Sequence, residues 1–299
     1  MSDSVQNDIH GENRQAPHDL TGSKLAWQSP VNLAIALLFG LFVIGVLFVL
    51  YEALLALTLP SASIQATVVL GALFCLLHGM RSMGSRRIGS LLILTLTVTL
   101  VAETLGVLTG LLFGEYQYNG HLGDQFLGLV PFVIPPAWFM MLYPSYIIAL
   151  RLTALGANDG SRREFQVALL GAAIMTTWDF VIDPVMVKIA FWEWETGRYF
   201  GVPFTNYLGW FIVSFVVLYV FGIRYPAGGE GYAPATSGRI LTAYYGLVGI
   251  SSAIAATSVG LVGPAALGMA GMSLWVVLGW RASMTGATVP APRRREIDS

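Results

Sequence analysis

Three acidic residues interrupt apolar stretches of this sequence that are long enough to cross a membrane. Glu103 lies in one stretch, and Asp179 and Asp183 lie together in another. An ionisable group in the hydrocarbon layer is costly, so such residues face a cavity or the interior of a helix bundle and mark a functional site. We therefore predict that these three residues are catalytic.

Buried acids in this pattern predict proton-transfer chemistry. Burial disfavours the charged form of a carboxyl group, and a neighbouring carboxylate disfavours it further. Because Asp179 and Asp183 are four residues apart and share one helix face, at least one of them is expected to hold a proton. Either aspartate could donate it, with the other as its partner, while Glu103 positions water or returns the proton. A purely structural role in hydrogen bonds between helices stays open.

The composition is that of a multi-pass membrane protein. Hydrophobic residues make up 55% of the 299 residues, charged residues only 11%, and the mean hydropathy is +0.67. With no basic surface, dinucleotide-binding loop or His-rich motif, the sequence predicts no nucleic-acid partner, no cofactor and no metal site. The single cysteine, Cys75, excludes an intrachain disulfide and is expected to be a small buried hydrophobe.

Eight stretches approach the roughly 20 apolar residues that a spanning helix requires. They cover residues 31–57, 63–80, 88–112, 130–150, 165–190, 205–223, 238–257 and 260–280. We therefore predict an all-α fold, a polytopic transmembrane bundle of about eight helices over residues 30–281. It follows a disordered polar N-terminal tail, 1–29, and precedes a basic C-terminal tail, 282–299.

Lysine and arginine are unevenly divided between the two ends of these spans. One end carries Arg14, Lys24, Arg81, Arg86, Arg87, Arg151, Arg162, Arg163, Arg224, Arg239, Arg281 and residues 293–295, whereas only Lys188 and Arg198 fall at the other. By the positive-inside rule the richer end, with both termini, is predicted to be cytoplasmic in a bacterial or archaeal membrane. The two acid-bearing spans then both run outward, and their acids share one layer roughly 9 to 16 Å below the outer end.

Further candidate residues lie beside the acids or in the loops that follow the two acid-bearing spans. They are Trp178, Trp192, Trp194, Tyr199, Asn206, Glu115 and Glu193. The aromatic residues could stabilise a cation through their ring faces, or they form an interfacial aromatic belt. The asparagine is a candidate water ligand or a helix N-cap. The two glutamates bound the mouth of a pocket or are solvated loop acids.

Other features of the spans are expected to be structural. Pro135, Pro136 and Pro184 are expected to kink the helices beside the acids and to shape the wall of a cavity. Glu52 and His78 lie near span ends and are interpreted as interfacial residues. The last two spans are rich in Gly, Ala and Ser, so they are expected to be closely packed scaffold.

Several blocks of this sequence resemble one protein family over residues 95 to 212. The blocks are Glu103-Thr-Leu-Gly, Phe113-Gly-Glu-Tyr-Gln-Tyr, Ala137-Trp-Phe-Met-Met-Leu-Tyr-Pro-Ser, Thr177-Trp-Asp, Asp183-Pro, Trp192-Glu-Trp, Gly197-Arg-Tyr-Phe-Gly-Val-Pro and Asn206-Tyr-Leu-Gly-Trp. They resemble the CruF-type membrane carotenoid hydratases, which include bisanhydrobacterioruberin hydratase and the lycopene or γ-carotene 1',2'-hydratases. The resemblance adds Trp138 and Tyr116 to the candidate substrate-binding residues.

What the resemblance implies is a hydro-lyase of carotenoid biosynthesis. It would add water across the terminal double bond of an acyclic ψ end group, giving a tertiary alcohol without a cofactor. The implied substrate is a carotenoid lipid, lycopene, γ-carotene or a C50 carotenoid, and the implied neighbours are membrane lipids and other enzymes of the same biosynthesis. Three alternatives stay open: a membrane lycopene cyclase, a prenyltransferase that binds Mg²⁺ through aspartates, and a proton-coupled transporter.

Overall fold

The computed structural model of this protein describes residues 29–55, 61–154, 161–226 and 235–284. Its helices are α2 (Pro30–Leu54), α3 (Ser61–Met83), α4 (Ser85–Thr109), α5 (Ile134–Thr153), α6 (Ser161–Lys188), α7 (Phe204–Arg224), α8 (Ala235–Ser258) and α9 (Val262–Met284). These eight described helices confirm the predicted all-α bundle. The largest difference from a predicted span end is four residues, as at the start of α5 (134 against 130). The predicted tails lie outside the described residues, apart from Ser29 and the last three residues of α9.

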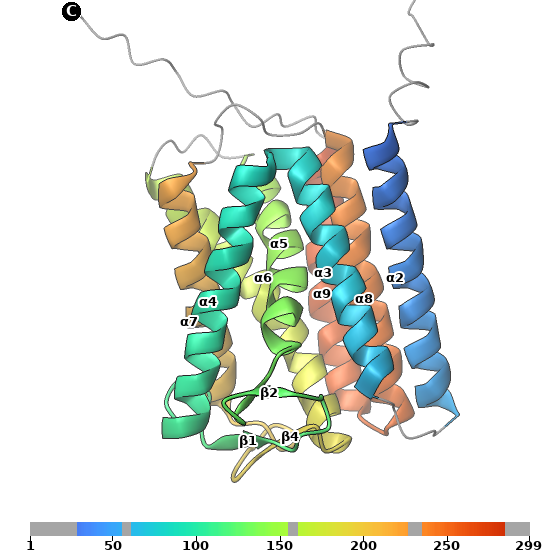
Figure 1. Ribbon diagram of the computed structural model, residues 1–299, viewed down its shortest axis with the longest axis vertical. Helices are drawn as coiled ribbons and strands as arrows, with labels where there is room; N and C mark the ends of the chain where they lie inside the picture. Colours follow the sequence, from blue (N-terminus) through green and yellow to red (C-terminus); the bar gives the residue numbers. More distant parts are fainter. Residues whose placement is uncertain (1–28, 56–60, 155–160, 227–234, 285–299) are drawn as a thin grey trace, which may run out of the picture.

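The centre of the bundle is occupied by α5, which packs against α3, α4, α6, α8 and α9 (Figure 1). Of the described helices, the other seven are long and apolar enough to cross a membrane, and α5 is the exception. Because neighbouring helices surround α5 in place of lipid, it can carry residues of lower hydropathy such as Tyr143, Pro144 and Tyr146, all of them buried. The predicted span 130–150 is therefore a helix enclosed by protein.

Two short antiparallel strand pairs lie at one end of the bundle, which we call the strand end (Figure 1). β1 (Tyr116–Tyr118) follows α4 and pairs with β4 (Trp192–Trp194), which follows α6. β2 (Gln125–Phe126) and β3 (Val130–Pro131) form a hairpin that leads into α5. The loops after the two acid-bearing helices are thus joined to each other by a strand pair.

The helices alternate in direction, so Pro30 of α2 and Met284 of α9 both lie at the end opposite the strands (Figure 1). Arginines such as Arg81, Arg151 and Arg224 lie near helix ends on that same side. The division of charge that the sequence predicts is therefore present in the described helices. Which end faces the cytoplasm stays a prediction.

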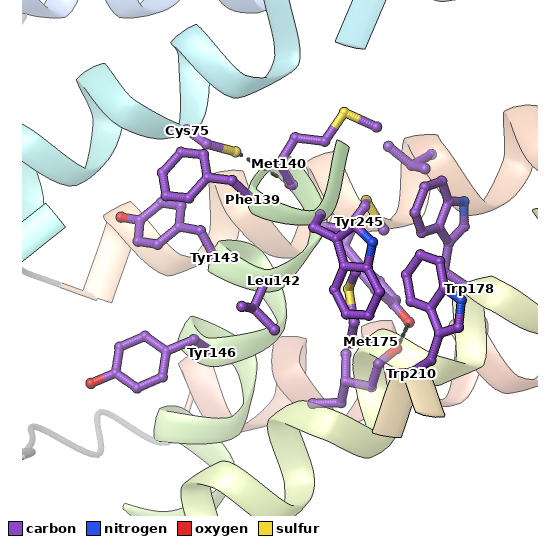
Figure 2. Close-up of a cluster of buried hydrophobic side chains, with 14 of the residues drawn as sticks. Cys75, Phe139, Met140, Leu142, Tyr143, Tyr146, Met175, Trp178, Trp210 and Tyr245 are labelled. Atoms are coloured by element: carbon purple, nitrogen blue, oxygen red, sulfur yellow. Dashed lines mark hydrogen bonds between the residues drawn. The ribbon is translucent and has the colours of Figure 1, made fainter. Parts of the chain in front are cut away.

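The prolines of α5 occupy positions that the helix tolerates. Pro135 and Pro136 lie in the first turn, where a helix has no partner for its N–H groups, so they begin α5 instead of kinking it. Pro144 lies inside the helix and cannot donate to the carbonyl of Met140, four residues earlier. The thiol of Cys75 on α3 contacts that carbonyl, with 3.4 Å between sulfur and oxygen (Figure 2). The buried cysteine therefore compensates for the proline.

Two residues interpreted as interfacial are buried between helices. Glu52 of α2 is 5% exposed and accepts a hydrogen bond from the hydroxyl of Ser63 at 2.7 Å. His78 of α3 is 3% exposed, with its Nδ1 2.9 Å from the hydroxyl of Tyr143 and 3.3 Å from that of Ser82. Both lie near helix ends, as predicted, but each faces a neighbouring turn or helix that supplies a polar partner.

Candidate active site

Glu103 lies on the buried face of α4 and accepts hydrogen bonds from three side chains. The buried positions of this helix recur at helical spacing: Ile88, Leu91, Thr95, Thr99, Ala102, Glu103 and Gly106. Oε2 of Glu103 accepts from the hydroxyls of Tyr116 (2.5 Å) and Tyr118 (2.9 Å). Oε1 accepts from the indole N–H of Trp138 (3.0 Å). Hydrogen bonds to a carboxylate favour its charged form, so these three donors offset part of the cost that burial imposes on an anion here.

The strand β1 supplies two of these three donors. Burial, and then the charge of Glu103, raise the pKa of the Tyr116 and Tyr118 phenols well above their usual range. Both hydroxyls therefore keep their protons and act as donors toward the carboxylate. The ring of Tyr116 stacks on Trp194 of β4, with 5.5 Å between ring centroids. The pairing of β1 with β4 thus holds the donors in place.

Asp179 and Asp183 lie one turn apart on α6 and share a single amide donor. Nδ2 of Asn206, in the first turn of α7, donates to Oδ2 of Asp179 (3.0 Å) and to Oδ2 of Asp183. All three side chains are buried. Oδ1 of Asp179 has no hydrogen-bond partner among the described residues. One shared donor poorly compensates two adjacent negative charges, which favours a proton held within the pair.

The N-cap of α7 is Pro203, so the predicted N-cap role of Asn206 is wrong. Instead, Asn206 turns its amide inward to the two carboxyl groups of α6. The carboxyl groups need a donor here because no backbone N–H is free in the middle of a helix. The asparagine therefore connects α6 and α7 through the acid pair.

Tyr199 supports α6 from the loop before α7. Pro184 lies inside α6 and cannot donate to the carbonyl of Phe180, four residues earlier. The hydroxyl of Tyr199 donates to that carbonyl at 3.1 Å. Tyr199 does not line the cavity beside the acids. Its contacts are those of a residue that stabilises the proline-containing turn next to Asp183.

One cavity of about 180 Å³ brings the two acid groups together. Glu103 and Asp183 both line it, whereas Asp179 does not. The aromatic residues of its wall are Phe42, Phe113, Tyr116, Tyr118, Trp138, Trp178, Trp192, Trp194 and Trp210. Asn206 lines it as well. The cavity is therefore apolar and aromatic, with a few polar groups that converge from α4, α6 and α7.

Tryptophans from three helices form one side of the cavity. The rings of Trp138 and Trp210 stack with 4.0 Å between centroids and 11° between planes. Trp178 packs edge-on against Trp210 with 6.0 Å between centroids, and Figure 2 labels both of these side chains. Trp210 was not among the residues predicted from the sequence to form the site. It follows Asn206 by four residues and therefore shares a face of α7 with it, which was the available signal. Nε1 of Trp192 lies buried at the cavity without an acceptor among the described residues.

Two of the sequence-predicted residues lie outside the cavity. Glu115 and Glu193 are exposed at the strand end and do not line the cavity.

The helix α8, expected to be scaffold, contributes Ser251 and Ser252 to the cavity wall, and Ser252 accepts from the indole N–H of Trp178 at 3.1 Å. Within the described residues, no three His, Cys, Asp or Glu side chains are grouped so that they could hold a metal ion.

The fold and the site define a multi-pass helical membrane protein with acids gathered at a buried, aromatic-lined cavity. The chain belongs to the family described as carotenoid biosynthesis protein, which matches residues 64–275, more than half of the chain. It is similar to bisanhydrobacterioruberin hydratase of Haloarcula japonica, at 32% identity over 154 residues. That alignment covers 52% of this chain and 51% of the relative, so the chain spans about half the length of the curated relative it matches. No solved structure matches the chain.

These comparisons confirm the resemblance that the sequence blocks carry. The family match extends well beyond residues 95 to 212, over most of the described helices. Apart from the residues of α2, every residue that lines the cavity falls within the matched residues 64–275.

Proposed function

We propose that this protein is a carotenoid hydratase that adds water across the terminal double bond of an acyclic ψ end group, giving a tertiary alcohol. One observation carries the proposal: two acid groups with different environments, Glu103 and Asp183, line the same apolar cavity. The family of the chain and the similarity to a hydratase support it. The lining of aromatic and aliphatic side chains suits a hydrocarbon substrate.

Asp183 is the proton donor in this proposal, because it lines the cavity and Asp179 does not. Its O–H bond breaks, and the π electrons of the alkene form a C–H bond with the proton at the less substituted carbon. The positive charge remains on the tertiary carbon. A lone pair of a water oxygen then bonds to that carbon, and a proton of this water passes to the Asp183 carboxylate. Alkene and water thus give alcohol, and the acid is restored.

Glu103 is the anion of this mechanism. Its three donors compensate its charge, and the charge stabilises the cation and orients the water. The stacked faces of Trp138 and Trp210 stabilise the same cation through their π electrons. The indole N–H of Trp192, which has no acceptor among the described residues, is a donor available to the oxygen of the attacking water.

The decisive experiment is expression of the chain in cells that accumulate lycopene, followed by mass analysis of the pigments. A hydratase adds the mass of one water per end group, whereas a cyclase leaves the mass unchanged. Conversion by purified protein in detergent, without an ion gradient, would exclude the transporter alternative. Failure to alter any acyclic carotenoid would overturn the proposal.

The acid assignment is tested by Asp183→Asn, with Glu193→Gln as the matched control. Loss of a general acid lowers the rate by about 10²- to 10⁴-fold, so we expect that loss for Asp183→Asn. Glu193 is exposed and lies outside the cavity, so its amide variant is expected to hydrate lycopene at the wild-type rate. Equal rates for both variants would show that Asp183 is not the donor.

A further inference from the structure

The cavity is too small to enclose a whole carotenoid. Its volume of about 180 Å³ is below the roughly 300–1,000 Å³ of sites that enclose drug-sized ligands. A C40 polyene is also nearly as long as the hydrocarbon core of a bilayer is thick, about 30 Å. Under the proposed function, therefore, only the reacting end group fits beside the acids, and the rest of the chain must leave the cavity.

One wall of the cavity is a continuous apolar stripe on α2. Phe42, Val46, Val49, Leu50 and Ala53 line the cavity from this helix. Their spacing places them on one face, and at 1.5 Å per residue the stripe is about 16 Å long. A stripe of this length beside a narrow cavity suits a linear hydrocarbon chain better than a compact ligand.

α2 is also the least enclosed wall of the cavity. It lies at the edge of the bundle and packs on α3 and, less extensively, on α8 (Figure 1). Its other face carries exposed apolar residues such as Ile44, Leu47 and Phe48. Across the weaker α2–α8 seam, the cavity-lining residues of α8 include the small residues Ser251 and Ala255. Phe42 and Tyr244 pack across the seam farther from the strand end, with 4.7 Å between ring centroids. Only beside the last turns of α8 do small side chains border the cavity on this side.

We infer that α2 and α8 form a lateral binding channel for the polyene, which extends from the acids between these two helices into the bilayer. This inference rests on the proposed function and adds the path of the substrate to it. The acyclic end group reaches Asp183 and Glu103, the adjoining chain lies along the α2 stripe, and the far end stays in lipid. Binding energy from this channel holds the end group in place without contributing to the proton transfer.

The channel is tested by two variants that fill it and two that do not. Val49→Phe and Ala255→Phe add a ring to cavity-lining positions, and Leu47→Phe and Ile254→Phe place the same ring on exposed faces of α2 and α8. For the filling variants we expect a KM for lycopene about tenfold higher, equivalent to roughly 1.4 kcal/mol, with kcat unchanged. Quenching of tryptophan fluorescence by lycopene should weaken in parallel. The two control variants should match the wild type in both measurements.

A filling variant that does not fold is replaced by Val49→Leu, which adds one methylene group and should shift KM in the same direction by less. If the filling variants and the controls have the same KM and the same quenching, the channel is refuted while hydration stands. If the wild type binds lycopene, loses that binding on filling and yet forms no alcohol, the channel stands and the proposed reaction fails.

Discussion

Asp179 and Asp183 carry the same functional group but differ in what surrounds them. They share the amide of Asn206, yet only Asp183 borders the cavity, and one oxygen of Asp179 is buried without a partner in the described part of the chain. We interpret Asp179 as a positioning residue that acts on Asp183 through their shared donor, Asn206. The environment of each acid, and not its residue type, sets its role.

The pair makes a prediction at the scale of single residues. Asp179→Asn removes the neighbouring carboxylate but leaves Asp183 at the cavity, so hydration should fall by less than it does in Asp183→Asn. The rates of product formation by the two variants measure the difference. An equal loss of rate in the two variants would contradict a positioning role.

A second residue-scale prediction concerns the donors to Glu103. Tyr116→Phe removes the hydroxyl that lies 2.5 Å from Oε2 and leaves the ring that packs on Trp194. An incompletely satisfied buried acceptor costs about 1–3 kcal/mol, so the variant should unfold at a lower temperature and hydrate more slowly. Tyr51→Phe, on an exposed face of α2, is the control and should keep the unfolding temperature and the hydration rate of the wild type. A wild-type rate in Tyr116→Phe would argue against an anionic role for Glu103.

At the scale of elements, the site depends on helices that contain prolines. Pro144 and Pro184 each leave a carbonyl without its usual donor, and a side chain from another element approaches each carbonyl: Cys75 in one case and Tyr199 in the other. A membrane interior offers no water to satisfy such a group. The contacts therefore tie α3 to α5, and the loop before α7 to α6 beside Asp183.

The contact between the Tyr199 hydroxyl and the carbonyl of Phe180 predicts that substitutions of Tyr199 and Pro184 have non-additive effects on stability. Tyr199→Phe leaves the carbonyl of Phe180 unsatisfied and should destabilise the protein by about 1–3 kcal/mol. Pro184→Ala restores the N–H that closes the helix bond to that carbonyl, so Tyr199→Phe should cost less in the Pro184→Ala background. Thermal unfolding of the four proteins of this double-mutant cycle measures the coupling. If the two substitutions have additive effects on stability, the hydroxyl of Tyr199 does not act by replacing the donor that Pro184 lacks.

At the scale of the molecule, local sequence patterns predict the helices but not how the loops meet. The spans were predictable because each is an apolar run of sufficient length, and Glu103, Asp179 and Asp183 stood out because they interrupt such runs. The pairing of β1 with β4 was not predictable, because it joins segments about 76 residues apart that carry only three residues each. The role of Tyr199 was missed for the same reason: it depends on a contact with Phe180 that no local pattern records.

The lateral channel leads to a prediction about the whole substrate. If the far end of the polyene lies in lipid, the protein contacts only the reacting end group and the chain next to it. An acyclic carotenoid with a ring at its far end should then be hydrated once, with a kcat/KM close to that of the first hydration of lycopene. Lycopene, which has two acyclic ends, should be hydrated twice in succession, because each end can enter in turn. Time courses of the singly and doubly hydrated products measure this, and a strong preference for one type of far end would place that end inside the protein.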